Sequence, residues 1–505
     1  MSALQSRRSA LIASCVLVAV IAAGAVLRFH AIGRKSLWLD EAATMNVVDC
    51  RYTEMLSSVI AHDAHPPVYY AMLHLWMQSS HSAVRARAFS AAVSVATLVV
   101  FYLLARVLLP RGGALLATGL LAASGFQVYF AQEARHYAMA AFFVTLSWYF
   151  FVQLVAGRWL ENWRWWLGLA LANTAALYTF YYAAFAILPQ FLVLLALWRG
   201  IGRRLVPGWL TWQVLPAALF ALYVPVILDQ FGRLRGMAPP AQYTVASVAG
   251  LTDTAAQFAC GFLGKLMGGS GAVAQAGAAA LGLLAVVAGF LSLRGSRLAS
   301  VVALSWLLGP IVLLALVPFR GHTYEPKHLI FAAPALALLP ALAWGSSRGI
   351  LKGAAIGLAA LLLAANALGL ARYYDPSVEK EDWRAAVGQL IEGVQPGDIV
   401  VFNPFYVRHP FHFYYRDHYR QCPIKPLEAP AVGKAFRAGE LELGRRVWVL
   451  EGASNVEVPN PEVLRALGGH KVILPPQRRE GLVGTVSVSL YDTFAPSAKG
   501  TGPAP

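Results

Sequence analysis

The sequence is poor in charged residues. Only 13% of its 505 residues are charged, whereas 58% are hydrophobic, a composition that excludes an ordinary soluble multidomain protein of this length. Uncharged runs such as 11–27 and 355–371 are about long enough to cross a hydrocarbon core of ~30 Å as helices. The first run follows Arg7 and Arg8, as in a secretory signal, but it exceeds a typical signal core and many further apolar runs come after it. The composition therefore predicts a polytopic α-helical membrane protein.

Cysteine and acidic residues are also scarce. The four cysteines, Cys15, Cys50, Cys260 and Cys422, have no CxxC or metal-like spacing, so no zinc or redox motif is indicated and any pairing among the last three is left open. The chain has 41 basic and 25 acidic residues, a net charge of +16. Much of that excess lies in short links between apolar runs, as the positive-inside rule requires. We therefore expect no nucleic-acid partner.

Eleven apolar ranges are candidates for transmembrane helices. They lie near 9–27, 87–108, 112–130, 137–155, 163–181, 183–198, 208–228, 272–292, 299–318, 327–345 and 350–371. Around 181–183, one re-entrant pair is as plausible as two separate spans. Arginine and lysine occupy alternate connections, with Glu161 as the only acid among them, and this alternation predicts a cytoplasmic N-terminus in the inner (plasma) membrane.

This topology leaves five segments on the outer side: 28–86, 131–136, 229–271, 319–326 and the chain after 371. Amphipathic spacing within 28–86 predicts helices that lie along the membrane interface. After 372, strand-like pieces (398–403, 445–452, 470–476, 483–494) and helical pieces (381–394, 461–469) follow one another. We expect a transmembrane domain at 1–371, a soluble α/β domain at 372–496 on the outer, periplasmic face, and a disordered tail at 497–505.

Ionisable and aromatic residues gather near the predicted outer ends of the spans. They occur in four stretches: SLWLDEAATM (36–45), HDAHPPVYYAMLHLW (62–76), AQEARHYAM (131–139) and FRGHTYEPKH (319–328). Charges at that depth are costly unless they are paired or lie in a wet cavity, so they are functional candidates. A carboxylate there can take the proton from a hydroxyl, and nearby cations can hold a phosphate and stabilise it as it leaves. The set suits sugar transfer from a polyprenyl phosphate.

Each of these residues also has a structural interpretation. Arg320 and Lys327 suit interfacial snorkelling about as well as ligand binding. Glu133 and Arg135 could form a local ion pair at a span end. The spacing of His62 and His65 favours a structural role over a metal site.

The motifs, taken in order, resemble a known superfamily. They are D-E after the first span, H-P-P-x-Y-Y in the first outer loop, E-x-R-x-Y before the fourth span, and a late basic-aromatic loop followed by P-x-H; K-E-D-W-R-A-A (380–386) and P-F-H-F-Y-Y (410–415) extend the likeness into the last domain. This order resembles the GT-C glycosyltransferases, and more narrowly glycosyltransferase family 39 and its relatives, which include protein O-mannosyltransferases and lipid A aminoarabinose transferases.

The resemblance implies the GT-C fold and an inverting transferase that uses a polyprenyl-phosphate sugar. It implies catalytic roles for Asp40, as the base, and for Glu41, which supports it. The implied donor-phosphate contacts are His65, Arg135, Arg320, Tyr324 and Lys327, with Glu133, Tyr137 and Tyr69 in supporting or substrate-binding roles. No cofactor is certain, and a divalent metal ion is left open. The expected partners are the lipid-linked donor, membrane lipids, and a glycolipid, glycan or, less favoured, protein acceptor.

The chain departs from the aminoarabinose transferases at 64–66, where it has A-H-P in place of E-K-P. This difference argues against a lipid A aminoarabinose role and against that branch's metal site. The alternative function is a secondary transporter or flippase of lipid-linked or anionic cargo. Transporters usually place polar groups near the bilayer midplane on repeated halves, whereas here they lie at span ends and no internal repeat is evident.

Overall fold

The computed structural model describes residues 3–63, 65–157, 160–235, 247–316, 324–346, 348–428, 446–454, 460–467 and 470–496. The predicted tail at 497–505 and the predicted site residue Arg320 lie outside these ranges. The chain packs into two compact units. A helical unit comprises Met1–Ile32 and Cys50–Asp375, and a sheet unit comprises Gly33–Asp49 and Pro376–Pro505. The segment that carries Asp40 and Glu41 thus belongs to the sheet unit.

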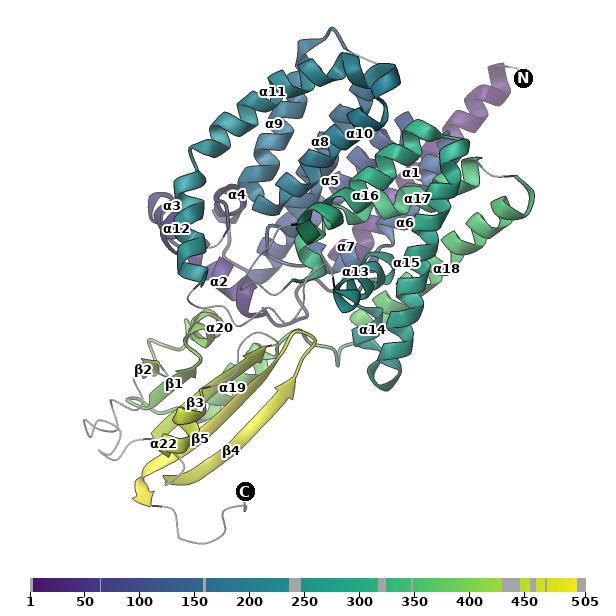
Figure 1. The fold of residues 1–505 in the computed structure, drawn as a ribbon. Helices are drawn as coiled ribbons and strands as arrows, with labels where there is room; N and C mark the ends of the chain where they lie inside the picture. Colours follow the sequence, from purple (N-terminus) through teal and green to yellow (C-terminus); the bar gives the residue numbers. More distant parts are fainter. Residues whose placement is uncertain are drawn as a thin grey trace. The chain divides into compact units, whose positions relative to one another are not determined.

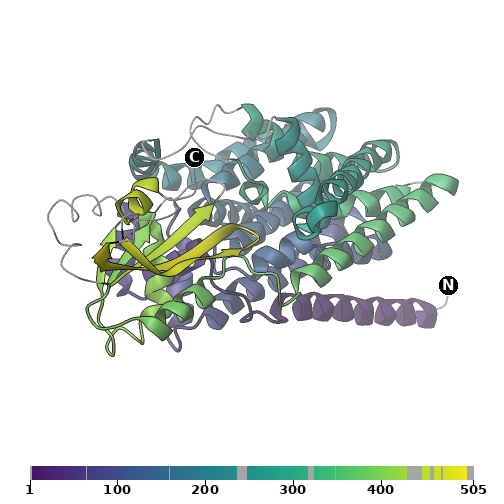
Figure 2. The same ribbon diagram turned by 90° about the horizontal axis from the view of Figure 1, so that it is seen from below.

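The helical unit follows the long apolar runs of the sequence (Figures 1 and 2). Its α-helices are α1 (Ala3–Phe29), α3 (Tyr52–His62), α4 (Val68–Met77), α5 (Ala83–Leu108), α6 (Arg111–Ala122), α7 (Gly125–Ala131), α8 (Tyr137–Val155), α9 (Trp163–Thr179), α10 (Ala184–Ala196), α11 (Arg203–Ala221), α12 (Val224–Arg235), α13 (Val248–Cys260), α14 (Leu263–Leu266), α15 (Gly271–Leu291), α16 (Arg297–Leu316), α17 (Ala333–Ser346) and α18 (Gly349–Tyr373). Short 3-10 turns include η1 (Tyr181–Ala183) and η5 (Pro326–Leu329).

Helices occupy all eleven ranges in which we predicted spans. Within the described residues, six helices, α1, α5, α8, α15, α16 and α18, are long and apolar enough to cross a membrane, and two bent helix pairs raise the number to eight. The range 112–130 is not the single helix that we expected. Ser124 accepts a hydrogen bond from the Gln127 amide and so begins α7, which lies at 55° to α6. The number of helices that cross the membrane stays a prediction.

The second bent pair breaks near residue 197, after the split around 181–183 for which two interpretations were open. Residues Tyr181–Ala196 and Trp198–Ala221 are bent by 89° at a short break, and Gly200 there has non-helical backbone angles. This pair is either a broken span or a re-entrant loop, and the choice between one re-entrant pair and two spans around 181–183, where α9 ends at Thr179 and η1 begins at Tyr181, stays open.

Helix α5 is central to the packing of the helical unit, where it contacts α1, α6 and α8. The buried guanidinium of Arg28, at the end of α1, ties these helices together. It donates to Ser94 Oγ of α5 at 2.8 Å and to the Ala122 carbonyl of α6 at 3.0 Å. A buried cation satisfied in this way stabilises the bundle, because its hydrogen bonds offset the loss of hydration.

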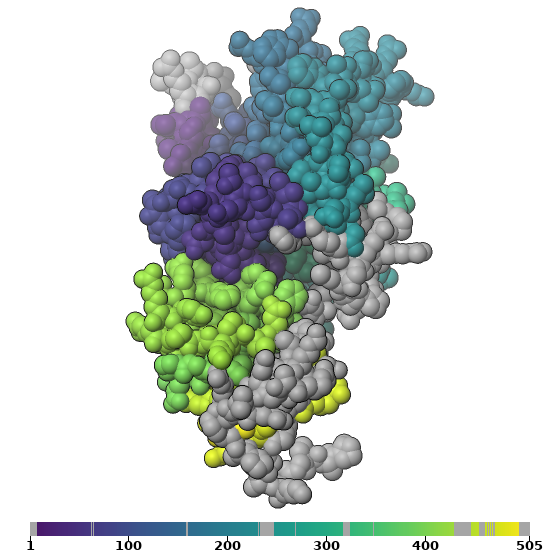
Figure 3. Space-filling view, turned by 90° about the vertical axis from the view of Figure 1, so that its left-hand side faces the viewer, coloured from purple at the N-terminus to yellow at the C-terminus, as the bar shows by residue number. Residues whose placement is uncertain are grey.

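The amphipathic segment after α1 forms helices, as its pattern predicts. Helices α3 and α4 pack against each other, and α3 also contacts α12 (Figure 3). Met55 and Val59 of α3 are fully buried, which fits the period of the apolar positions.

Within the described residues, the sheet unit contains five strands and four α-helices. The strands are β1 (Ile399–Asn403), β2 (Lys425–Glu428), β3 (Arg446–Ser454), β4 (His470–Glu480) and β5 (Gly484–Pro496), and the helices include α2 (Leu39–Val48), α19 (Trp383–Gly393), α20 (Arg408–Tyr415) and α22 (Pro461–Leu467). The strand order is β2-β1-β3-β5-β4. Strand β1 is parallel to β2 and β3, whereas β5 is antiparallel to β3 and β4. All four predicted strands and both predicted helices are present; β2 and α20 were not predicted.

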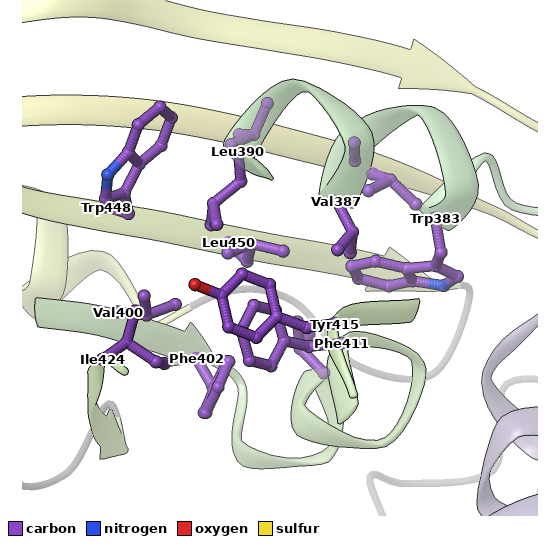
Figure 4. Close-up of a cluster of buried hydrophobic side chains, with 14 of the residues drawn as sticks. Trp383, Val387, Leu390, Val400, Phe402, Phe411, Tyr415, Ile424, Trp448 and Leu450 are labelled. Atoms are coloured by element: carbon purple, nitrogen blue, oxygen red, sulfur yellow. The ribbon is translucent and has the colours of Figure 1, made fainter. Parts of the chain in front are cut away.

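The two faces of the sheet follow from alternation along the strands. Val400 and Phe402 of β1 pack with Trp383, Leu390 and other apolar side chains of α19 and α20 (Figure 4). Their neighbours Ile399 and Val401 pack on the opposite face, with Val463 and Leu467 of α22. Both faces of the sheet are therefore covered, and the unit has a hydrophobic core of its own.

Candidate active site

The candidate site in the helical unit is built around the carboxylate of Asp63, directly after α3. Its Oδ1 lies 2.9 Å from Nδ1 of His65, and its Oδ2 accepts a hydrogen bond of 2.8 Å from the Tyr70 hydroxyl. Burial would raise the pKa of Asp63. The hydrogen bonds and the positive groups of His65 and Arg135 outweigh it and hold that pKa well below its usual range. Asp63 is therefore ionised at neutral pH and fixes the orientation of two neighbouring side chains.

Arg135 joins this group from the link between α7 and α8. Its Nη1 donates to the Tyr70 hydroxyl at 3.3 Å, and its Nη2 lies 3.5 Å from His65 Nδ1. The side chain is 5% exposed. His65, from the first loop, and Arg135, from the second link, are thus brought together, as we expected for charged residues near span ends, and Tyr70 joins them.

His136 lies beside His65, and the sequence analysis did not select it. The two rings are 4.3 Å apart, and Phe180 lies 4.5 Å from the His136 ring on another side. His136 is 1% exposed, and neither ring nitrogen has a hydrogen-bond partner within the described part of the chain. Burial, followed by the charges of His65, Arg135, His328 and Lys327, lowers the pKa of His136 well below its ordinary value. The imidazole is therefore neutral at physiological pH.

The late outer link supplies a second group of polar side chains. Lys327 Nζ lies 2.9 Å from Glu325 Oε1, and His328 stacks on Tyr182 with ring centroids 5.0 Å apart. Burial would raise the pKa of Glu325, but the charges of Lys327 and His328 lower it to about 2. The charges of Lys327 and His328 also lower the pKa of His136. This link therefore lies near the Asp63 group in the helical unit.

The other predicted residues of the helical unit lie around these groups. Tyr69 is buried, with its hydroxyl 3.3 Å from Ser90 Oγ. Glu133 is completely buried on the same link as Arg135, and Tyr137 packs against His136 with ring centroids 4.4 Å apart. The Tyr324 hydroxyl lies 2.6 Å from Thr254 Oγ1 and is directed to α13, and burial raises its pKa.

Asp40 and Glu41 lie in the first turn of α2, within the sheet unit. Asp40 is half-buried, whereas Glu41 is completely buried. Helix α2 packs against α20, and Asn46 Nδ2 donates to the His409 carbonyl at 3.2 Å. Burial and the charges of Arg408 and His412 lower the pKa of His409 to about 4, and Asp40 opposes that shift.

The described residues contain no group of three or more His, Cys, Asp or Glu side chains that could hold a metal ion. The side chain of His62 lies outside the described set.

Four contributors to the site were not selected from the sequence: Asp63, Tyr70, His136 and Glu325. Asp63 and Tyr70 belong to the quoted stretch HDAHPPVYY, and the D-x-H spacing of residues 63 and 65 was the available signal. Burial of an imidazole without a partner, as for His136, has no such signal because it depends on packing between distant segments.

Comparison with known proteins finds similarity in sequence and in fold. The sequence model of the family described as Dolichyl-phosphate-mannose-protein mannosyltransferase matches residues 64–228, a range that contains His65 and Arg135. No curated protein matches the sequence. ArnT from Cupriavidus metallidurans in the apo state is 14% identical and superposes with a TM-score of 0.54, covering 94% of this chain and 98% of its own. The chain has the GT-C fold.

Two further structures with this fold carry ligands in their crystals. ArnT bound to undecaprenyl phosphate is 15% identical, with a TM-score of 0.51 over 93% of this chain and 97% of that one. The Archaeoglobus fulgidus oligosaccharyltransferase in complex with Zn and sulfate is 13% identical, with a TM-score of 0.50 over 86% of this chain and 67% of that one. The resemblance to GT-C glycosyltransferases, and the prediction of a helical membrane protein with a C-terminal sheet domain, are confirmed.

Proposed function

We propose that this protein is an inverting glycosyltransferase that moves a sugar from a polyprenyl-phosphate donor to a hydroxyl group, on the outer face of the inner membrane. The GT-C fold and the matched family region support the proposal. The class of donor is inferred from a structural relative, since ArnT has been crystallised with undecaprenyl phosphate.

One observation carries the proposal: Arg135 contacts both Tyr70 and His65 in a buried group organised by Asp63. Charged groups buried beside membrane helices are costly, so they are retained where a substrate needs them. Arginine suits this task because its planar guanidinium can donate two parallel hydrogen bonds to a phosphate, whereas the ammonium of lysine interacts with it as a point charge. A polar group of this kind, set against apolar helices, fits a ligand with a charged head and a lipid tail.

The proposed reaction is a single displacement. Asp40 takes the proton from the acceptor hydroxyl, and the acceptor oxygen forms a bond to the anomeric carbon. The bond between that carbon and the phosphate oxygen breaks, and polyprenyl phosphate leaves with the electron pair. Arg135, Lys327 and His65 stabilise the negative charge that builds on the phosphate. Arg320 and Tyr324 are further proposed contacts of the phosphate, and Glu41 supports the base.

The remaining roles concern shape and orientation. Glu133, Tyr137 and Tyr69 are proposed to line the donor position, with Asp63 holding His65 and Tyr70 in place. Fixed orientation of reactants can supply several kcal/mol, roughly 7–11 in well-oriented systems, of the barrier reduction. The acceptor is proposed to be a glycolipid or glycan of the cell envelope, with a protein less favoured.

A metal ion is not assigned a step. The described acids and histidines form no cluster suited to one, whereas the cations near His136 can serve the leaving phosphate directly. Transfer measured with and without a chelator tests this point.

The function can be tested with purified protein in nanodiscs and a panel of polyprenyl-phosphate sugars, each with glycolipid, glycan and peptide acceptors. Wild type should release polyprenyl phosphate from one donor. Arg135→Gln should raise the donor KM or abolish release, whereas Arg164→Gln should not, because Arg164 is exposed at the start of α9. Movement of a labelled lipid or anion across liposomes without consumption of any donor would favour the transporter alternative.

A further inference from the structure

The ten residues of α2, which carry Asp40 and Glu41, are attached to the sheet unit by contacts that bridge more than 340 positions of sequence. The Leu39 amide, at the first position of the helix, donates to Glu381 Oε2 at 2.9 Å. The first amides of a helix have no partner within the helix, and Trp38, the residue before it, provides no side-chain cap. Glu381 therefore substitutes for the missing cap.

Two more backbone amides before α2 are held in the same way. The Ser36 amide donates to Glu379 Oε2 at 2.9 Å, and the Leu37 amide donates to the Tyr414 hydroxyl at 2.7 Å. The guanidinium of Arg384 donates to the Arg34 and Gly33 carbonyls at 2.8 and 3.2 Å. Side chains of the sheet unit thus bind both the backbone amides and the backbone carbonyls of the segment 33–37, which precedes α2.

Glu381 is itself fixed from the hydrophobic core. Its Oε2 accepts a second hydrogen bond, of 2.7 Å, from Nε1 of Trp383. Trp383 is 1% exposed and packs in the core of the sheet unit (Figure 4). The carboxylate that caps α2 is consequently connected by one hydrogen bond to the hydrophobic core of this unit.

The far end of α2 is held as well. Asn46 donates to the His409 carbonyl of α20, and Asp49 forms an exposed ion pair with Arg416 at 3.3 Å. A helix of ten residues is not stable alone in water. Its position, and with it the direction of Asp40, must therefore come from these contacts.

We propose that Glu379, Glu381, Arg384 and Tyr414 are positioning residues for Asp40, and that the C-terminal domain serves the reaction by holding this carboxylate at its working place. The proposal rests on the assignment of Asp40 as the base under the proposed function. It gives the segment K-E-D-W-R (380–384) a role in catalysis through α2, without contact with the substrate.

The test compares Tyr414→Phe with Tyr406→Phe in the full-length protein. Both changes remove one hydroxyl from the sheet unit. The Tyr406 hydroxyl, however, donates to the Gly452 carbonyl of β3 at 3.3 Å. Tyr414→Phe should speed hydrogen exchange at the amides of 36–42 and lower kcat about 2- to 10-fold, with little change in donor KM or in thermal unfolding. Tyr406→Phe should match wild type in all four measurements.

A second pair of variants tests the cap of α2 itself: Glu381→Ala removes it, and Glu381→Gln is the conservative replacement. Removing the cap should loosen 36–42 further and lower kcat by roughly ten- to a hundred-fold, because small misplacements of a reacting group are costly. Glu381→Gln, whose amide oxygen can still accept from Leu39, should recover most of the lost kcat. If Glu381→Ala also lowers the unfolding temperature, Tyr414→Phe still decides the question.

Faster exchange at 36–42 with an unchanged kcat would overturn the positioning role, and so would unchanged exchange in both variants. Failure of the underlying function looks different. Asp40→Asn would then transfer sugar as well as wild type while Tyr414→Phe still loosened α2. That result would reject Asp40 as the base, and the positioning claim with it, but would leave the attachment of α2 intact.

Discussion

Arg135 Nη1 donates a hydrogen bond of 3.3 Å to the hydroxyl of Tyr70, which in turn donates to Asp63. This relationship joins a cation from the link before α8 to a carboxylate that follows α3. It makes the phosphate-binding role proposed for Arg135 dependent on the whole group, so that changes at different members should have distinguishable effects.

Replacing Arg135 by lysine should keep the positive charge but remove the planar guanidinium that can donate two parallel hydrogen bonds. We expect the donor KM to rise by roughly ten-fold or more, because Lys cannot reproduce bidentate contacts. Steady-state kinetics with the preferred donor measures this change. The matched substitution Arg164→Lys should leave KM unchanged; an equal effect at both positions would mean that Arg135 acts only through general charge.

Asp63→Asn should destabilise the helical unit at neutral pH. The pKa of Asp63 lies below its value in the unfolded chain, so the ionised carboxylate stabilises the fold above pH ~4. That contribution is lost as the pH falls through the folded-state pKa. We therefore expect Asp63→Asn to cost about 1–3 kcal/mol at pH 7. The gap between variant and wild-type unfolding temperatures should narrow in acid. A gap that widens toward low pH would contradict the sign of this shift.

His136 should remain neutral throughout the physiological range. Burial and the neighbouring positive charges lower its pKa, so its ring signals in NMR spectra of selectively labelled protein should not titrate between about pH 6 and 8. Titration of His136 near its ordinary value would show that its surroundings are wetter than the structure indicates.

Lys327→Gln should weaken donor binding and also remove the cation next to Glu325. Because Lys327 and His328 hold the pKa of Glu325 at about 2, loss of Lys327 should raise that pKa. The donor KM should increase, and the double variant Lys327→Gln/Glu325→Gln should recover part of the loss. Lys352→Gln, at an exposed cation over the Trp344 ring, is the control that should have no effect.

Much of this arrangement could be predicted from local sequence. The apolar ranges predict the helices because their length and hydropathy are local properties, and strand alternation predicts β1, β3, β4 and β5. The grouping of His65 with Arg135 followed from the cost of charges near span ends. Strand β2 was missed for two reasons. Its sequence K-P-L-E is mostly exposed and has no alternation of apolar and polar residues, and it contains a proline, which is unfavourable inside a strand.

Other features depend on contacts between distant residues. The break before α7 depends on a single serine cap within an apolar run, a weak signal against the hydropathy around it. The attachment of α2 to the sheet unit rests on pairs such as Leu39 and Glu381, and neither partner indicates the other locally. Asp63 was not selected from the sequence, because its hydrogen bond from Tyr70 and its proximity to Arg135 appear only in the folded chain.

The central claim is that this chain cleaves a polyprenyl-phosphate sugar and forms a new glycosidic bond with inversion. NMR of the product formed by wild type and by Asp40→Asn, from a donor labelled at the anomeric carbon, tests it most directly. The account predicts a product with the opposite anomeric configuration for wild type, free polyprenyl phosphate in equal amount, and neither for Asp40→Asn. Retention of configuration, or undiminished transfer by Asp40→Asn, would contradict it.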